Sequence, residues 1–529
     1  MRPTILKAAV ALGLASTAVA CSVVLKDPLS VLAAPHRASK TVTFSRAEAI
    51  QEVDALAGMI DRIHADPYRF RSREVVESEH RRLVESMPAL LTRRELCLRL
   101  SRLLATLDDG HSSMNCHVLV LQEWQKAAKA SPPETQKLRM FQPAMRLDDQ
   151  NHLIVRWPNY APGIEAGDRL LRVNGQDADA LLAAWAREES HDTEAGRIAV
   201  VARRFRLLLD LHGISAPYRV TVAAPGGASR DVMIQGDPVN YQFQQRPDPA
   251  PAPSPAPAPA AASASTPAPK PVELRTPFFN YRMVRPGVAY MDFFSLIGDN
   301  LFDAPSSFKK AVEAMFRQVA IDRPHVLIVD VRENGGGEDS MAAELLSHVT
   351  EKPFRLLASA QVRRSKEMRD AGKSVIRIPF RWMGLPLLMA EGRQYYLGKV
   401  GSLSGPEKRP IKKWPRSEPF FDGPVCVLIG PHTFSAATEF AGAIKAFGLA
   451  TLVGEETGGK PNAFGNPFSF PLRRSGLVVE MATARAERAS GDVTDFTPVI
   501  PDIVVRTTAA DIQKFFDPVL ERAVNCPAR

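Results

Sequence analysis

Leucines recur at helical spacing through the early part of the chain. They stand at positions 83, 90, 98, 103 and 104, while acidic residues at positions 54, 61 and 77 mark a polar face. This period of three to four residues predicts amphipathic helices over residues 45–106. We expect a helical domain over residues 45–125, which includes a short polar loop, LDDGHSSM, at Leu107–Met114.

The pattern changes to short strands around a single helix between Phe141 and Gly236. It closes with two strands over Tyr218–Ile234 that a Gly-Gly turn joins, and we expect a β-rich domain over residues 140–240. Its segment GIEAGDRLLRVNG (Gly163–Gly175) resembles the core of a PDZ domain. The resemblance implies that this domain binds an extended peptide as an added strand and holds its terminal carboxylate.

A run of proline and alanine, DPAPAPSPAPAPAAASASTPAPKP at Asp248–Pro271, divides the chain. It lacks the large apolar residues that a core needs, and its prolines favour an extended conformation. We expect a linker over residues 246–272.

Strands and helices alternate after the linker. A strand is predicted at Val288–Phe294 and fully buried strands at His325–Val331 and Pro424–Ile429, with helices at Ser306–Ala320 and Ser435–Phe447. Continuous apolar strands followed by helices are typical of α/β proteins. The expected fold class is therefore α/β, with a core over residues 278–510 and a C-terminal helix and tail over residues 511–529.

The N-terminus has the pattern of a secretory signal peptide over residues 1–20. Basic residues precede a short apolar run at Ala8–Leu14, and Ala18-Val19-Ala20 stands before Cys21. The run is too short to cross a membrane. Either simple cleavage or a bacterial lipoprotein box at Cys21 fits, so we expect export to the periplasm or membrane attachment through a lipidated Cys21. Residues 21–44 would be an N-terminal linker.

The other cysteines are at positions 97, 116, 426 and 526, a spacing that matches no zinc or redox motif. In an exported protein a disulfide could join Cys97 to Cys116, or fix the tail through Cys526. Cys426 lies in an apolar run, which predicts a buried thiol.

The formal net charge of +9 has a local origin. Residues 363–416 contain fourteen Lys or Arg and four Asp or Glu, a net +10. They include neither spaced finger ligands nor a basic recognition helix, so we expect no nucleic-acid partner. A solvated basic face is the usual meaning of such a stretch.

Three loops carry residues suited to catalysis. RENGGGED at Arg332–Asp339 follows a buried strand, and its glycines could turn N–H groups toward an oxyanion, although such turns also serve as plain links. Ser435 follows a strand and opens a helix, where a serine acts either as a helix cap or as a nucleophile beside unpaired N–H groups. GEETGGKPNAFG at Gly454–Gly465 fits the start of a phosphate-binding loop, but Pro461 replaces the required Ser or Thr.

Four motifs together resemble the C-terminal processing peptidases, or tail-specific proteases, including their tricorn-core branch. The motifs are DVRENGGG, the strand-loop-helix at Ser435, VGEETGGKPN, and PVIPDIVV at Pro498–Val505. They cover roughly residues 280–505. The resemblance implies a serine peptidase with a ClpP/crotonase-like core, protein or peptide substrates, and no metal or organic cofactor.

The resemblance also implies roles for single residues. Ser435 matches the nucleophile, and the base is Lys460 in one branch or His111 of the D-G-H loop in the other. In the second branch Asp495 would be the acid, at a position where the family has glutamate.

A histidine titrates near neutral pH, whereas a lysine needs its pKa lowered by burial. We therefore favour His111, Ser435 and Asp495 over Lys460. The expected oxyanion hole combines the N–H of Ala436 with that of Gly336 or Gly337. His117 and His432 are interpreted as histidines without a catalytic role.

Two other functions share this fold. The chain could be a binding protein for peptides or apolar ligands that keeps the peptidase fold without turnover. A crotonase-type acyl-CoA enzyme is the other alternative, and export argues against it because coenzyme A is intracellular.

Overall fold

The computed structural model describes residues 43–129, 138–159, 161–238, 274–275, 279–296, 304–375 and 393–527. The expected signal peptide, Cys21 and the linker run at Asp248–Pro271 lie outside the described residues. Among the described helices, none combines the length and apolarity needed to cross a membrane.

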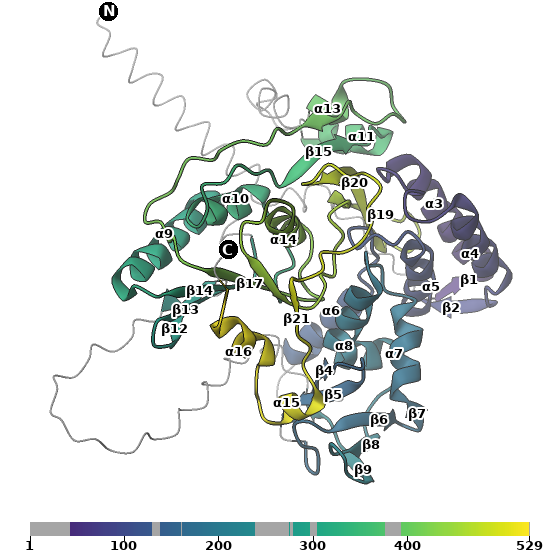
Figure 1. The fold of residues 1–529 in the computed structure, drawn as a ribbon. Coiled ribbons are helices and arrows are strands. Elements are labelled where there is room, and N and C mark those ends of the chain that lie inside the picture. Colours follow the sequence, from purple (N-terminus) through teal and green to yellow (C-terminus); the bar gives the residue numbers. More distant parts are fainter. Residues whose placement is uncertain are drawn as a thin grey trace, which may run out of the picture.

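Three helices and a small two-stranded antiparallel sheet form the first part of the structure (Figure 1). They are α3 (Arg46–Ile63), α4 (Arg73–Glu85), α5 (Arg93–Ala105), and the strands β1 (Thr43–Ser45) and β2 (Leu90–Thr92). Both α3 and α5 begin with a capping box, formed by Ser45 with Glu48 and by Thr92 with Glu95. A fourth helix, α6 (His117–Lys129), follows the D-G-H loop.

The next part is an antiparallel sheet covered by two helices. Its strands run in the order β4 (Ala144–Leu147), β5 (Leu153–Trp157), β6 (Arg169–Val173), β8 (Tyr218–Ala223) and β9 (Ser229–Ile234), and β7 (Gln176–Asp177) pairs with β6. β3 (Arg139–Met140) pairs separately with β10 (Asp237–Pro238).

The sequence pattern predicted one helix in this domain, and that count is wrong. The structure has α7 (Ala178–Ala186) and the longer α8 (Glu194–Leu211). Phe205 and Leu209 of α8 are fully buried. Arginines stand between the apolar residues of α8, so its helical period is hard to recognise in the sequence.

The core is α/β, as the sequence predicted, and its central sheet has seven described strands. Its order is β11 (Leu274–Arg275), β12 (Phe279–Arg285), β13 (Val288–Phe293), β14 (Val326–Asp330), β17 (Val425–Ile429), β18 (Thr451–Gly454) and β21 (Ile503–Val504). The strands from β13 to β21 are parallel. Helices α9 (Ala304–Asp322), α10 (Asp339–Ser347) and α14 (Ala436–Phe447) share one apolar cluster with the sheet, and α16 (Pro518–Val524) packs on the opposite face.

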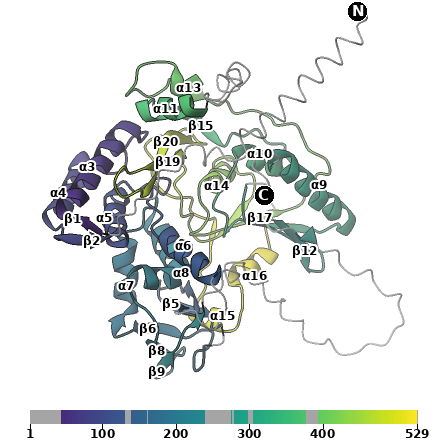
Figure 2. The ribbon, with the colours of Figure 1, turned by 180° about the vertical axis from the view of Figure 1, so that it is seen from behind.

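A second sheet connects the core to the first helical part. Its order is β16 (Glu407–Lys408), β15 (Leu357–Val362), β20 (Val478–Arg488) and β19 (Phe464–Pro471). Val479 and Met481 of β20 are buried in the same apolar cluster as α3 and α5. Helices α11 (Lys366–Val375) and α13 (Arg393–Tyr396) lie beside this sheet, as both ribbon views show (Figure 2).

Two disulfides are present in the described residues. Cys97 pairs with Cys116, one of the alternatives that the sequence left open. Cys426 pairs with Cys526, so the prediction of a free buried thiol at Cys426 is wrong. The tail folds back through α15 (Ala509–Gln513) and α16, which brings Cys526 beneath β17.

Candidate active site

Ser435 lies at the sharp junction between β17 and α14. Its backbone has φ 53° and ψ −130°, a left-handed φ that a non-glycine residue adopts only when its surroundings impose it. Its side chain makes no capping hydrogen bond to the helix. The helix-cap interpretation therefore does not describe this serine, whose hydroxyl is directed to another partner.

That partner is His111. Its Nε2 atom is 2.9 Å from Ser435 Oγ, although 324 residues separate the two in sequence. The Phe434 ring stacks on the imidazole at a centroid distance of 4.6 Å. Ser113, two residues further along the loop, pairs through its backbone with Glu480 of β20. The D-G-H loop is thus fixed to the second sheet, and this holds the imidazole beside the serine.

A buried carboxylate, Asp109, neighbours the other side of His111. Its Oδ1 accepts the backbone N–H of His111 at 2.9 Å and lies 3.7 Å from His111 Nδ1. Its Oδ2 accepts hydrogen bonds from Ser112 Oγ at 2.6 Å and from His64 Nε2 at 3.0 Å. Asp109 and His64 are both fully buried. Asp109 stands in the LDDGHSSM loop, and no role was predicted for it from the sequence.

Asp192 adds a second buried carboxylate. It accepts the N–H of Gly110 at 2.8 Å and the N–H of Lys460 at 3.1 Å. Ligand-type atoms of Asp109, His111 and Asp192 all lie within 4.8 Å of one another. Asp192 lies just before α8, the helix that the sequence pattern missed, so nothing in the sequence placed it near His111.

The carboxylates change the acid-base properties of the site. Burial alone would lower the pKa of His111, but the neighbouring charges of Asp109, Asp192 and Glu480 raise it above the ordinary value. Burial alone would raise the pKa of the Asp109 carboxyl, but its interactions with His111 and His64 outweigh burial and leave this pKa lowered. The arrangement therefore favours an imidazolium at His111 facing a charged Asp109.

Asp495 has different partners. Its Oδ1 accepts the N–H and the hydroxyl of Thr497, at 2.9 and 2.6 Å, and its Oδ2 pairs with Arg488. The hydrogen bonds from Thr497 lower its pKa. Both carboxylate oxygens are thus engaged away from His111.

Lys460 lies near the site without a described contact to Ser435. Its ammonium is 4.3 Å from the centre of the Phe70 ring, and burial lowers its pKa. Burial also lowers the pKa of His432 to about 4 and that of His117 to about 3. Neither histidine has a described hydrogen bond to Ser435.

The glycine loop approaches the nucleophile closely. A Cβ atom on Gly336 would lie 2.6 Å from Ser435 Cβ, and this glycine has φ +103°. The N–H of Gly336 donates to Asn334 Oδ1 at 2.8 Å, and Asn334 also joins the loop to Phe293 and Phe434. Gly337 is the next residue of the loop, and Ala436 opens α14, where first-turn N–H groups have no acceptor within the helix.

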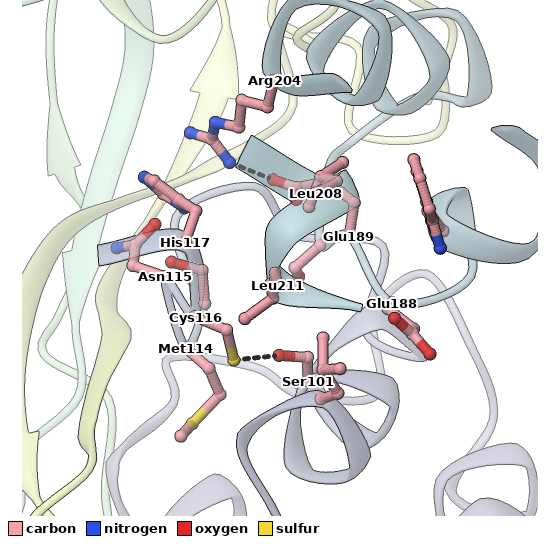
Figure 3. Close-up of a pocket in the computed structure, with 14 residues that line it drawn as sticks. Ser101, Met114, Asn115, Cys116, His117, Glu188, Glu189, Arg204, Leu208 and Leu211 are labelled. Atoms are coloured by element: carbon pink, nitrogen blue, oxygen red, sulfur yellow. Dashed lines mark hydrogen bonds and ion pairs between the residues drawn. The ribbon is translucent and has the colours of Figure 1, made fainter. Parts of the chain in front are cut away.

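A separate small cavity is lined in part by the residues that follow His111 in the chain, Ser113–His117 (Figure 3). Its volume is about 30 Å³, room for a water molecule or two, and it is lined by residues that include Met114, Cys116 and His117. Glu189 and Arg204 pair at one side of it, and Ser101 contacts the Cys116 sulfur. Neither Ser435 nor His111 lines this cavity.

Comparison with known proteins identifies the core. Residues 288–505 match the model of peptidase family S41. An uncharacterized protein of Chlamydia muridarum (strain MoPn / Nigg) is 26% identical over 217 residues, a match that covers 36% of this chain and 36% of that protein. The match therefore spans about a third of the length of that relative.

Solved structures share the wider fold. The crystal structure of mature CPAF is 19% identical, with a TM-score of 0.61, and the match covers 90% of this chain and 96% of that one. Mature CPAF complexed with lactacystin is 17% identical with the same TM-score, and the match covers 90% and 97% of the two chains. At these identities the similarity to CPAF shows a common fold, which extends over the helical part, the β-rich part and the core.

Proposed function

The chain belongs to peptidase family S41 through residues 288–505, which makes it a serine peptidase by family, and we propose that it is an endopeptidase with Ser435 as nucleophile and His111 as base. The observation that carries the proposal is the 2.9 Å contact between His111 Nε2 and Ser435 Oγ. The strained backbone of Ser435 and its absent capping bond support the same role.

The reaction is acyl transfer. His111 Nε2 accepts the Ser435 proton as Oγ forms a bond to the peptide carbonyl carbon, and the carbonyl π electrons move to its oxygen. The tetrahedral intermediate collapses, the C–N bond breaks, and His111 returns the proton to the leaving amine. Water then attacks the acyl-enzyme by the same route, which releases the acid and restores the Ser435 hydroxyl.

The oxyanion of the intermediate would be held by the N–H groups of Ala436 and Gly337. The position of Ala436 at the start of α14 supports its part, because the helix dipole adds to the hydrogen bond. Gly337 is preferred to Gly336 because the N–H of Gly336 is already bonded to Asn334.

Asp109 is the better candidate for the acid that stabilises the imidazolium. It is buried and 3.7 Å from His111 Nδ1, whereas the carboxylate of Asp495 is bonded to Thr497 and Arg488. Asp192 would add a second negative charge near the same ring. A modest approach of Asp109 or one bridging water would complete a hydrogen bond in the reacting complex.

The substrate class would be proteins or peptides, and capture of their C-terminal tails by the β-rich domain is part of the proposal. β9 pairs only with β8 within the described residues, which leaves a sheet edge where an extended chain could add. Binding of a labelled peptide that is lost when its C-terminus is amidated would support tail capture, and equal binding would contradict it.

We also propose export, with Cys21 as the candidate lipidation site. Two disulfides support an oxidising compartment. Fractionation of cells that produce the Cys21→Ser variant separates the alternatives: the variant becomes soluble if Cys21 is lipidated and keeps its distribution if it is not.

The activity is tested by hydrolysis of an unfolded protein substrate together with labelling by a fluorophosphonate. We expect both from the wild-type protein and neither from Ser435→Ala. Absence of both from the folded wild-type protein would contradict the proposal and favour a non-catalytic binding protein. Lactacystin, which the CPAF complex contains, is a second compound to test as an inhibitor.

A further inference from the structure

We propose that His64 is a positioning residue for the candidate active site, where it holds the Asp109 carboxylate in the orientation that serves His111. This inference rests on the proposed function and extends it to a residue outside the motifs that the sequence singled out. His64 lies at the C-terminal end of α3, 47 residues before His111 (111 − 64).

The tautomer of His64 follows from its two partners. Its Nδ1 accepts the backbone N–H of Asp66 at 3.1 Å, so that nitrogen carries no proton. The proton of the neutral ring is therefore on Nε2, which lies 3.0 Å from Asp109 Oδ2. His64 thus acts as a fixed donor toward the carboxylate.

The surroundings hold this donor in place. His64 has no exposed surface, and the Phe464 ring packs edge-on against it at a centroid distance of 4.5 Å. The next residue, Ala65, donates its backbone N–H to Ala482 of β20 at 3.1 Å. His64 is consequently held both by the helical part and by the second sheet.

Asp109 depends on such donors because it is charged and fully buried. Oδ2 receives hydrogen bonds from His64 and Ser112, and Oδ1 receives the N–H of His111. Without His64, one bond to a buried carboxylate is lost and a rotation of that carboxylate is no longer opposed from this side. Since Asp109 Oδ1 is already 3.7 Å from His111 Nδ1, a small rotation would weaken its hold on the imidazolium.

The chain offers a matched control in His80. It also pairs with an aspartate, Asp54, through Nε2 at 2.7 Å, and the pair lies in the same helical part between α3 and α4. That pair is solvent-exposed and has no described contact with Asp109 or His111. Substitutions at His80 therefore report the loss of a histidine–aspartate pair without a link to the candidate site.

The experiment compares His64→Leu, His64→Gln and His64→Asn with His80→Leu in the full chain. Glutamine places an amide N–H as many bonds from the backbone as Nε2 does, whereas asparagine reaches only as far as Nδ1. We expect His64→Leu and His64→Asn to lower kcat roughly 10- to 100-fold with little change in KM, and His64→Gln to recover most of the activity. His80→Leu should match the wild-type protein.

A pH profile separates positioning from a merely structural role. His111 faces Asp109, Asp192 and Glu480, and weaker contact with Asp109 should move the acid limb of kcat/KM to lower pH in His64→Leu and His64→Asn. Loss of folded protein would reduce the amplitude and leave the limb in place. If His64→Leu does not fold, the two amide variants decide the matter, because both are polar and differ in reach.

The outcomes are distinct. If the wild-type protein is active and His64→Gln and His64→Asn have equal kcat and equal acid limbs of kcat/KM, the positioning role is overturned. The proposed function then remains intact. Wild-type protein that neither hydrolyses peptides nor labels overturns both. Recovery in His64→Gln alone, with the shifted limb in His64→Asn, supports the inference.

Discussion

His111 Nε2 and Ser435 Oγ lie 2.9 Å apart, although the histidine belongs to the helical part of the structure and the serine to the α/β core. The histidine stands on the loop after α5, and the serine precedes α14 of the core. Their contact depends on the backbone pairing of Ser113 with Glu480, which fastens the loop to β20. The contact on which the proposed active site depends therefore joins a loop of the helical part to the start of a core helix.

The identity of the acid gives the first prediction. Asp109→Asn should lower kcat by about 10² to 10⁴, because the amide cannot stabilise the imidazolium as a carboxylate does. Asp495→Asn should keep nearly wild-type kcat, because this carboxylate contacts Thr497 and Arg488. Steady-state kinetics on a peptide substrate measures both, and the reverse ranking would return the role to Asp495.

The pH dependence gives the second prediction. His111 must be neutral to accept a proton, and its nearby carboxylates raise its pKa, so activity should fall with decreasing pH from above the ordinary value of about 6.5. Glu480→Gln removes one of these charges and should move the acid limb to lower pH. A limb that moves to higher pH in this variant would contradict the assigned electrostatics.

The disulfides give the third prediction. They join residues 19 and 100 positions apart, separations for which loop closure predicts about 3 and about 5 kcal/mol of stabilisation. Replacing Cys97 and Cys116 by serine should lower both the melting temperature and kcat, because this bond closes the segment that contains His111. Replacing Cys426 and Cys526 should lower mainly the melting temperature. Thermal unfolding and kinetics on both double variants check this prediction. A folded Cys97/Cys116 double variant with wild-type kcat would show that this disulfide does not help to position His111.

Gly336 gives the fourth prediction. Gly336→Ala places a methyl group 2.6 Å from Ser435 Cβ at a backbone φ of +103°. The loop must then shift away from the nucleophile, and we expect kcat to fall at least about tenfold while the protein still folds. Gly335→Ala is the matched control, because a Cβ there meets no atom within 4 Å. Equal kcat in the two variants would show that the close approach is unimportant.

The core was predictable because its central strands are wholly buried. Continuous apolar runs at Val326–Asp330 and Val425–Ile429 can hardly be exposed, and both form parallel strands of the central sheet. α8 was missed because arginines at positions 197, 203, 204 and 206 interrupt its apolar residues. A disulfide that fixes the tail through Cys526 was one of the alternatives, but its partner Cys426 was missed, because an apolar run gives no sign that a distant tail folds back against it.

The candidate site was predictable where residues sit within motifs. Ser435 and His111 were both named from sequence, and the structure brings them into contact. His64 and Asp192 reach the site only through tertiary packing, and neither stands in a motif. Asp109 could have been predicted as a site residue, because it stands two residues before His111 in the LDDGHSSM loop.

The rate of fluorophosphonate labelling at Ser435, followed by intact mass, tests the central claim most directly. The wild-type protein, Lys460→Ala and the control His432→Ala should be labelled at similar rates. His111→Ala should be labelled at least about 10³-fold more slowly, and Ser435→Ala not at all. Labelling that survives in His111→Ala and disappears in Lys460→Ala would contradict the account and assign the base to the lysine.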